Sequence, residues 1–213
     1  MKSPAFDYVR ATSAQQALAL LAQHGDDARL LAGGQTLLAT LNLRLSRPAL
    51  LVDIGGLHAL AGISLQGGTL RIGALTKHVE IEESPLVAQY APLLAQAAPH
   101  IAHRAIRNLG TFGGALAHAD PAAEWPACVL ALGATLVLQG VNGERRVAVA
   151  DFFRGVYTTA RRDDELLGLR DSAAGSGRTT AFQRVGAPPR RLCHRGPGRL
   201  RSRWQRQWRR RVD

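Results

Sequence analysis

Two glycine-rich loops constrain this chain more than any other feature of its sequence. The first reads Ala-Gly-Gly-Gln-Thr-Leu over residues 32–37, and the second reads Asn-Leu-Gly-Thr-Phe-Gly-Gly over residues 108–114. Adjacent glycines allow the backbone to turn with a positive φ, and they remove the Cβ atoms that would keep a ligand away. Their N–H groups can then converge on an anion, helped by the helix that each loop leads into. Two such loops predict a ligand with a diphosphate, held from both sides.

Paired glycines do not by themselves establish a ligand site. Neither loop has the G-x-G-x-x-G spacing of a Rossmann site or the G-x-x-x-x-G-K-[ST] spacing of a P-loop. Paired glycines also form ordinary tight turns, and for one loop alone a tight turn is as good an interpretation as a ligand site. Two loops in one chain favour the ligand.

Length and cysteine content exclude several classes of protein. The chain of 213 residues has enough apolar material for one large domain or two small ones. It contains no run of 18 apolar residues and no apolar segment at its N-terminus, so the sequence predicts no membrane span, no secretory signal and a cytoplasmic protein. Its two cysteines, Cys128 and Cys193, cannot form a disulfide framework, a four-thiolate iron–sulfur site or a cysteine zinc site. No metal ligands are expected.

The net charge of +11 lies entirely at the C-terminal end. Residues 1–167 contain equal numbers of basic and acidic side chains, whereas residues 168–213 contain 13 arginines and only two aspartates. The chain therefore consists of two stretches of different composition joined end to end.

Hydrophobic patterning over residues 13–167 predicts mixed helices and strands without a regular βαβ alternation, so we expect the α+β class. Ser13 and Gly25 have the residue types of helix caps, Thr36 and Thr76 are expected to start helices, and Pro121 is expected in the first turn of another. The expected helices cover residues 13–25, 36–45, 76–83, 86–98 and 121–132, with a short one from 151. The expected strands cover residues 28–32 and 50–54, with hairpins over 63–72 and 135–149 and a strand from 164.

The order of these motifs resembles the FAD-binding (medium) subunit of molybdenum hydroxylases, the group of carbon-monoxide dehydrogenase and xanthine dehydrogenase. The resemblance covers residues 4 to about 167 in order. It is carried by the first loop with Leu-Val-Asp-Ile at 51–54, by Ile-Gly-Ala-Leu-Thr at 72–76, by residues 107–124 around the second loop, and by residues 151–159 and 164–167.

This resemblance implies a two-subdomain FAD-binding fold of the molybdenum hydroxylase and vanillyl-alcohol oxidase type, here without its C-terminal subdomain. The implied parts are a small α/β subdomain over residues 1–56, a second subdomain over 57–167, a remnant over 168–184 and a disordered Arg-rich tail over 185–213. It implies no catalytic residue. The implied FAD-binding residues are Ala32, Gly33, Gly34, Gln35, Thr36, Leu37, Thr111, Phe112, Gly113, Gly114, Ala115, Asp120, Glu124 and Leu167.

Within that set the implied roles differ. Backbone amides of both loops would hold the diphosphate, with hydroxyl donors from Thr36 and Thr111. Asp120 and Glu124 would lie near the ribityl chain or the isoalloxazine, although acids beside a proline also serve simply to satisfy a helix N-terminus. Ala115 stands where relatives often carry Ser or Asn, so one polar contact is lost. His103 and His118 are interpreted as solvated or structural.

After residue 167 the resemblance thins. Residues 180–184 still resemble the family's next strand, whereas residues 185–196 show no periodicity. One permitted set of codons for these residues, read one base later, gives Trp-Ala-Arg-Arg-His-Gly-Asp-Phe-Ala-Ile-Val. The family has a basic loop ending Gly-Asp-Phe-Ala at this place. We therefore expect that a frameshift at or just before Val185 produced the tail; the alternative is a genuine basic extension that binds RNA or an acidic membrane surface.

The function that the resemblance implies is electron transfer. FAD on this chain would accept electrons from [2Fe–2S] clusters of a small partner subunit, reduced in turn by a molybdopterin-binding large subunit, and pass them to an external acceptor. No nucleic-acid partner is expected. Two alternatives remain: a different FAD-dependent oxidoreductase of similar fold, and a non-catalytic basic protein that binds nucleic acid through the tail.

Overall fold

The structure is a computed structural model that describes residues 2–173. The remnant and the Arg-rich tail predicted for the C-terminal end lie outside the described residues, apart from the strand that ends at residue 173. No helix in residues 2–173 has the length and apolar character needed to cross a bilayer.

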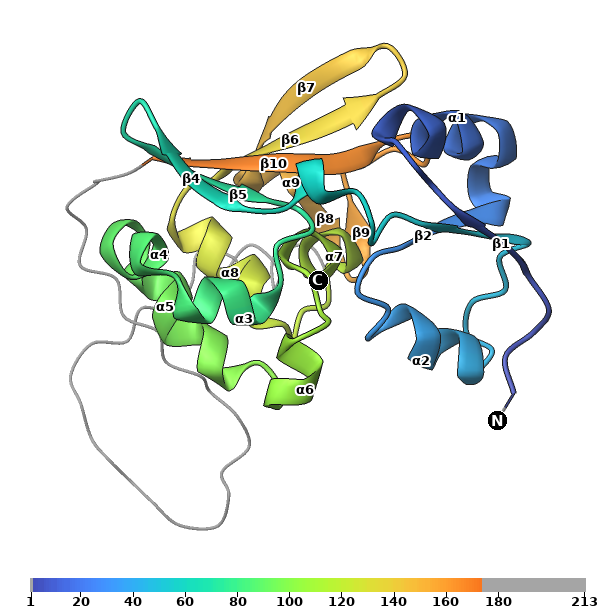
Figure 1. Cartoon of the computed structure of the whole chain (residues 1–213), viewed down its shortest axis with the longest axis horizontal. Helices are drawn as coiled ribbons and strands as arrows, with labels where there is room; N and C mark the ends of the chain where they lie inside the picture. The colour runs from blue at the N-terminus through green and yellow to red at the C-terminus, as the bar shows by residue number, and fades with distance from the viewer. Residues whose placement is uncertain (1, 174–213) are drawn as a thin grey trace, which may run out of the picture.

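A small parallel sheet forms the N-terminal part (Figure 1). Its strands are β1 (Asp7–Arg10), β2 (Ala28–Leu31) and β3 (Leu50–Asp53), in the order β1-β3-β2. Helix α1 (Ala14–His24) connects β1 to β2, and α2 (Leu37–Asn42) lies between β2 and β3. The carboxyl end of β2 therefore leads directly into the first glycine loop.

The predicted caps of α1 are confirmed. The Ser13 hydroxyl accepts a hydrogen bond from the Gln16 amide at 3.1 Å, and Gly25 ends the helix with φ of 51°. Leu18 and Leu21 belong to the hydrophobic cluster of the small sheet and are almost fully buried. The helix forms because its cap satisfies an otherwise orphaned amide while one apolar face is buried.

The second part is built on an antiparallel sheet in the order β4-β5-β10-β6-β7. Both predicted hairpins are present: β4 (Ile63–Gln66) pairs with β5 (Thr69–Gly73), and β6 (Thr135–Gly140) pairs with β7 (Gly143–Ala148). Strand β10 (Leu166–Ala173) lies between the two hairpins and pairs with β5 and β6. This central strand joins segments that are far apart in the sequence.

One face of this sheet is covered by helices (Figure 1). Leu70 and Ile72 of β5 and Leu136 and Leu138 of β6 alternate along their strands, and all four are buried in the core beneath those helices. The helices are α3 (His78–Glu83), α4 (Pro85–Tyr90), α5 (Pro92–Ala97), α6 (Arg104–Arg107), α7 (Phe112–His118) and α8 (Glu124–Ala131). The short elements are α9 (Val149–Phe152), β8 (Phe153–Gly155), β9 (Thr158–Thr159) and three 3₁₀ turns at Gly25–Asp27, His58–Leu60 and Ala98–His100.

Two hydrophobic clusters make up the core, and they meet at β10. Leu167 belongs to the large cluster under the antiparallel sheet. Its neighbour Leu166 belongs to the cluster of the small parallel sheet, together with Leu18, Leu21 and Leu75. Because successive side chains of a strand point to opposite faces, one strand contributes to both cores.

An ion pair fixes the start of β10. The buried carboxylate of Glu165 accepts hydrogen bonds from Arg145 Nε at 2.6 Å and Arg145 Nη2 at 2.8 Å, and from the Arg162 amide at 2.7 Å. Arg145 Nη2 also donates to the Ala160 carbonyl at 2.6 Å. The pair joins β7 to the turn before β10, close to the junction of the two cores.

The predicted starts of two helices are wrong. Helix α3 begins at His78, and the Thr76 hydroxyl instead bonds both the amide and the carbonyl of Gly62 at 3.0 Å. Helix α8 begins at Glu124, three residues after Pro121. In both cases a tertiary or local contact outweighed the helix start that the residue type suggested.

Candidate functional site

The two glycine loops lie against each other. An ideal Cβ placed on Gly33 would collide with the Leu109 carbonyl oxygen and would lie 2.9 Å from Gly110 Cα. A Cβ placed on Gly114 would lie 4.0 Å from Ala32 Cβ. The loops belong to the two different parts of the fold, and these contacts bring them side by side.

The first loop offers a row of free donors. Within the described residues, no hydrogen bond is donated by the backbone N–H groups of Gly33, Gly34, Gln35 or Thr36. Gly34 has φ of 70°, and the Gln35 side chain donates to the Gly33 carbonyl at 3.0 Å, so the loop is held in a tight turn. Consecutive backbone amides without internal partners can together bind an anion such as a diphosphate.

Thr36 does not cap the following helix as its residue type predicts. Its backbone is helical, with φ of −95°, and its side chain makes no capping hydrogen bond with α2. The residue is exposed, so its hydroxyl is accessible beside the free amides. The loop turns at Gly34, which removes the extended geometry that an N-cap side chain needs.

The second loop is constructed differently. Its Phe112 amide donates to the Thr76 carbonyl at 2.9 Å, its Gly113 amide donates to the Ala74 carbonyl at 2.7 Å, and its Gly114 amide donates to the Thr111 hydroxyl at 3.2 Å. None of its glycines has a positive φ, so the expected left-handed turn is wrong here. These amides already have partners within the protein, and the second loop therefore offers fewer free donors than the sequence predicts.

The glycines of the second loop instead permit close packing. A Cβ on Gly113 would come within 2.8 Å of the Ala74 backbone, and one on Gly114 would come within 2.7 Å of the Thr111 hydroxyl. Thr111 is buried and caps α7, whereas Gly114 is exposed. The start of α7 thus presents bare backbone to the outside, which a ligand can approach closely.

Of the two predicted acids, Asp120 lies between α7 and α8, and Glu124 lies at the start of α8. Asp120 Oδ1 accepts a hydrogen bond from the Ala122 amide at 2.8 Å, so one carboxylate oxygen stabilises the turn that leads to α8. Glu124 is the first residue of α8 and is half-buried. Asp120 therefore does have the structural role that an acid beside a proline often takes, and its second carboxylate oxygen is the one left for a ligand.

Leu167 stands behind the second loop. The carbonyl of the next residue, Gly168, accepts a hydrogen bond from the Ala74 amide at 2.9 Å, and the Ala74 carbonyl in turn accepts from Gly113. Ala115 packs on the large core at the first turn of α7, and Leu37 is half-buried at the start of α2. These residues support the loops with apolar surface.

A buried histidine that no sequence motif indicated lies directly under the second loop. His78 is 6 % exposed, and its Nδ1 accepts a hydrogen bond from Trp125 Nε1 at 3.0 Å. Burial first, and then the positive charges of Lys77 and Arg107, lower the pKa of His78 to about 4. The imidazole is therefore neutral at pH 7. Its signal in the sequence was weak, because the partner tryptophan is 47 residues away.

The other histidines near the site take no part in this contact. The His118 ring packs against Tyr157 with a centroid separation of 4.9 Å, and burial lowers its pKa despite the opposing charge of Asp120. His103 is exposed before α6.

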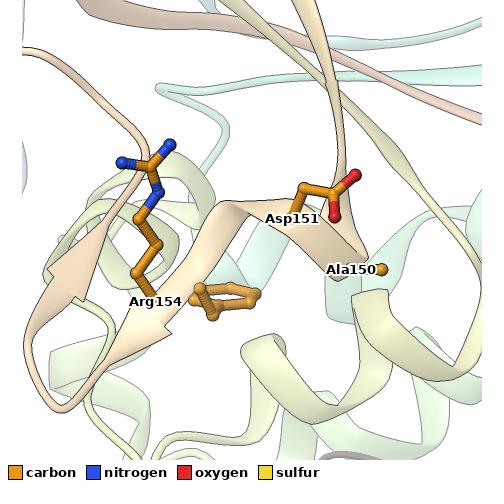
Figure 2. Close-up of a pocket in the computed structure, with 4 residues that line it drawn as sticks. Ala150, Asp151 and Arg154 are labelled. Atoms are coloured by element: carbon orange, nitrogen blue, oxygen red, sulfur yellow. The ribbon is translucent and has the colours of Figure 1, made fainter.

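A pocket lies at α9 and β8, apart from the glycine loops. Figure 2 shows it lined by Ala150, Asp151, Phe153 and Arg154, with the two charged side chains directed away from each other. No residue of either glycine loop lines it. The two adjacent glycine loops, residues 32–37 and 108–114, are called the cradle below, and this pocket is separate from it.

Comparisons with known proteins bear on what this cradle binds. A family described as the FAD binding domain in molybdopterin dehydrogenase matches residues 4–168. The chain is 47% identical over 167 residues to the 6-hydroxypseudooxynicotine dehydrogenase complex subunit alpha of Paenarthrobacter nicotinovorans, covering 78% of this chain and 56% of that protein. It is 41% identical over 186 residues to the carbon monoxide dehydrogenase medium chain of Hydrogenophaga pseudoflava, covering 87% of this chain and 65% of that one.

Solved structures agree with the sequence comparisons. A carbon monoxide dehydrogenase from Hydrogenophaga pseudoflava, which lacks the Mo-pyranopterin moiety of its cofactor, matches with a TM-score of 0.81 and 42% identity. That match covers 83% of this chain and 61% of the other. The chain thus spans less than two thirds of the length of these relatives. The α+β class expected from the hydrophobic patterning and the FAD-binding fold implied by the resemblance are both confirmed.

Proposed function

This chain belongs to the family of FAD-binding domains of molybdopterin dehydrogenases, and from that premise we propose that it serves as the FAD-carrying electron-transfer subunit of a molybdenum hydroxylase. FAD is the cofactor of this family. When bound, FAD would supply a group that can take up two electrons and release them to an acceptor. The chain's own residues supply binding, orientation and electrostatic tuning.

The single observation that carries this proposal is the row of four free amides beside a second glycine loop. Gly33, Gly34, Gln35 and Thr36 would donate to the diphosphate, because their N–H groups have no internal partner among the described residues. The exposed face of the second loop at Gly114 would approach the same group from the other side.

The acids and the apolar residues would orient the rest of the cofactor. Asp120 would accept a hydrogen bond from a ribityl hydroxyl through the oxygen that Ala122 does not use. Glu124 would lie beside it at the start of α8. Ala115 offers no polar atom at its position, so the cofactor loses one contact there, while Leu37 and Leu167 would exclude water.

We propose two partner subunits for the complete enzyme. The names of the relatives describe one as a subunit of a dehydrogenase complex and another as a medium chain. A small subunit with [2Fe–2S] clusters would deliver electrons to this chain, and a molybdopterin-binding large subunit would oxidise the substrate. An external acceptor would then take the electrons from this chain.

The test is to purify the full chain alone and after co-expression with candidate molybdopterin and iron–sulfur subunits. We expect flavin absorbance at about 450 nm in both preparations, and bleaching of that absorbance by substrate only in the complex. An isolated chain that oxidises substrate without partners, or a chain that binds nucleic acid and no flavin, would contradict the proposal.

A further inference from the structure

His78 contacts both the second glycine loop and the first turn of α8, and so links the two. The His78 amide donates to the Gly110 carbonyl at 3.0 Å. A Cβ on Gly110 would lie 2.7 Å from His78 Nε2, so the loop backbone rests directly on the imidazole ring. Only glycine allows this approach.

Trp125, in the first turn of α8, contacts both His78 and the loop residue Phe112. Its indole N–H donates to His78 Nδ1 at 3.0 Å, and its ring meets the Phe112 ring edge to face with centroids 5.4 Å apart. Both Trp125 and Phe112 are 1 % exposed. Gly110 and Phe112 flank Thr111 in the loop, and Trp125 follows Glu124 in the chain. The loop and the acid of α8 are therefore joined through one buried hydrogen bond.

We propose that His78 is a positioning residue for FAD, which fixes the second glycine loop and Glu124 relative to each other before the cofactor arrives. The inference rests on the proposed function, because it assumes that the loop and Glu124 contact the same molecule. Lys77 adds to the arrangement, since its Nζ donates to the Leu109 carbonyl at 3.2 Å. A loop held in its binding conformation costs less entropy when the ligand binds.

The hydrogen bond is tested by Trp125→Phe, which keeps an aromatic ring and removes the donor, and by His78→Leu, which removes the acceptor. His78→Asn keeps an acceptor at the same point of the side chain. The control is Val87→Ala in α4, a fully buried residue of the same core that lies on a different helix from both partners. The readouts are the Kd of the full chain for FAD, from the change in flavin fluorescence on binding, and the Tm of the FAD-free chain.

We expect Trp125→Phe and His78→Leu each to raise the Kd for FAD by about tenfold, because each leaves a buried polar group unpaired next to the loop. The double variant should weaken binding by less than the product of the two single effects, since both remove the same bond. His78→Asn should restore part of the affinity. Val87→Ala should lower the Tm and leave the Kd within about twofold of the wild type.

Two outcomes would overturn the inference, and they differ. If the wild-type chain binds FAD and the variants lose Tm without losing affinity, His78 is only a core residue and the proposed function stands. If the wild-type chain binds no FAD, the proposed function fails and the inference fails with it. Should His78→Leu not fold, Trp125→Phe and His78→Asn decide the question alone.

Discussion

Gly33 packs so closely against the carbonyl group of Leu109 that the two glycine loops share one surface. The contact is between backbone atoms, which cannot relieve a clash by changing rotamer, so each loop restricts the position of the other. The cradle is therefore one structure assembled from two parts of the chain.

We predict that Gly33→Ala separates the loops. The new methyl group would collide with backbone, so the substitution should destabilise the fold by about 2 kcal/mol or more and abolish FAD binding. Urea unfolding and flavin fluorescence measure the two effects. Gly140→Ala is the matched control, since a Cβ there finds its nearest contact at an ordinary 3.7 Å and should change neither quantity measurably. Unaltered FAD binding in Gly33→Ala would show that the loops do not act together.

At Gly34 the predicted effect has a different origin. Its φ of 70° makes Gly34→Ala strained by about 1 kcal/mol, and the Cβ would also lie 3.1 Å from Leu38 Cδ1 and reshape the turn that carries the free amides. Gly67→Ala provides the control, because Gly67 has a φ of 56° and open space around it. Both variants should lose similar stability in urea unfolding, and only Gly34→Ala should lose FAD affinity. Equal FAD affinity in the two variants would refute a role for the first loop.

The stability of the chain should fall in mild acid through His78. The pKa of His78 is about 4 in the folded chain and about 6.5 when unfolded, so the unfolded chain binds the extra proton between these values. The contribution of His78 should therefore be constant above pH 7, and stability should drop by about 2 kcal/mol between pH 7 and pH 5. Lys77 and Arg107, the latter paired with Glu82 at 2.7 Å, also disfavour the charged imidazole.

Urea unfolding at pH 7 and pH 5 measures this drop. His78→Asn cannot take up the proton, so its stability should change less than that of the wild type over the same interval. Identical pH dependence in the two proteins would mean that the pKa of His78 is the same in the folded and the unfolded chain.

We expect the ion pair between Arg145 and Glu165 to stabilise the fold mainly because its acid is buried. Burial alone would raise the pKa of Glu165, but its hydrogen bonds with Arg145 and the Arg162 amide, and the charges of these arginines, bring it below its ordinary value. Arg145→Met should lower the free energy of unfolding by about 2 kcal/mol at pH 7, because it leaves the Glu165 carboxylate buried and charged without its partner. The loss is no larger because Arg145 itself is partly exposed. Adding Glu165→Gln should recover part of the loss in urea unfolding. A single variant as stable as the wild type would refute this account.

The frameshift hypothesis concerns residues outside the described part of the chain and is tested at the level of the gene. Resequencing around the codon for Val185 should reveal a reading frame that continues into Gly-Asp-Phe-Ala, as expected from the family. A confirmed frame identical to the present one, together with codons that cannot give this sequence one base later, would favour the genuine basic extension.

The parts of this protein that depend on local pattern could be predicted from its sequence. The cap at Ser13, both hairpins and the two loops follow from residue type and spacing, and the structure contains them. The predictions that Thr36 and Thr76 start helices as caps are wrong. A hydroxyl beside a helix forms a cap only when the backbone of its residue is extended and the hydroxyl has no better hydrogen-bond partner. Thr76 has a better partner in Gly62.

What could not be predicted depends on residues brought together by the fold. The hydrogen bond between His78 and Trp125 joins two helices across the core, and no spacing rule relates them. The occupied amides of the second loop escaped prediction for the same reason, since their acceptors at Ala74 and Thr76 belong to another segment. Periodicity describes which face is buried but not which polar groups meet there.

Because Leu166 and Leu167 belong to different hydrophobic clusters, β10 determines when the two parts of the fold can form during synthesis. The small parallel sheet emerges from the ribosome first, yet its hydrophobic cluster includes Leu75 and Leu166, which are made much later. Part of the apolar surface of the N-terminal segment therefore stays exposed until β10 has been made. Contacts between residues so far apart in the sequence also form slowly. We expect the diphosphate cradle to form late and in one step with β10, so that a nascent chain cannot hold FAD before nearly all of the described residues have left the ribosome.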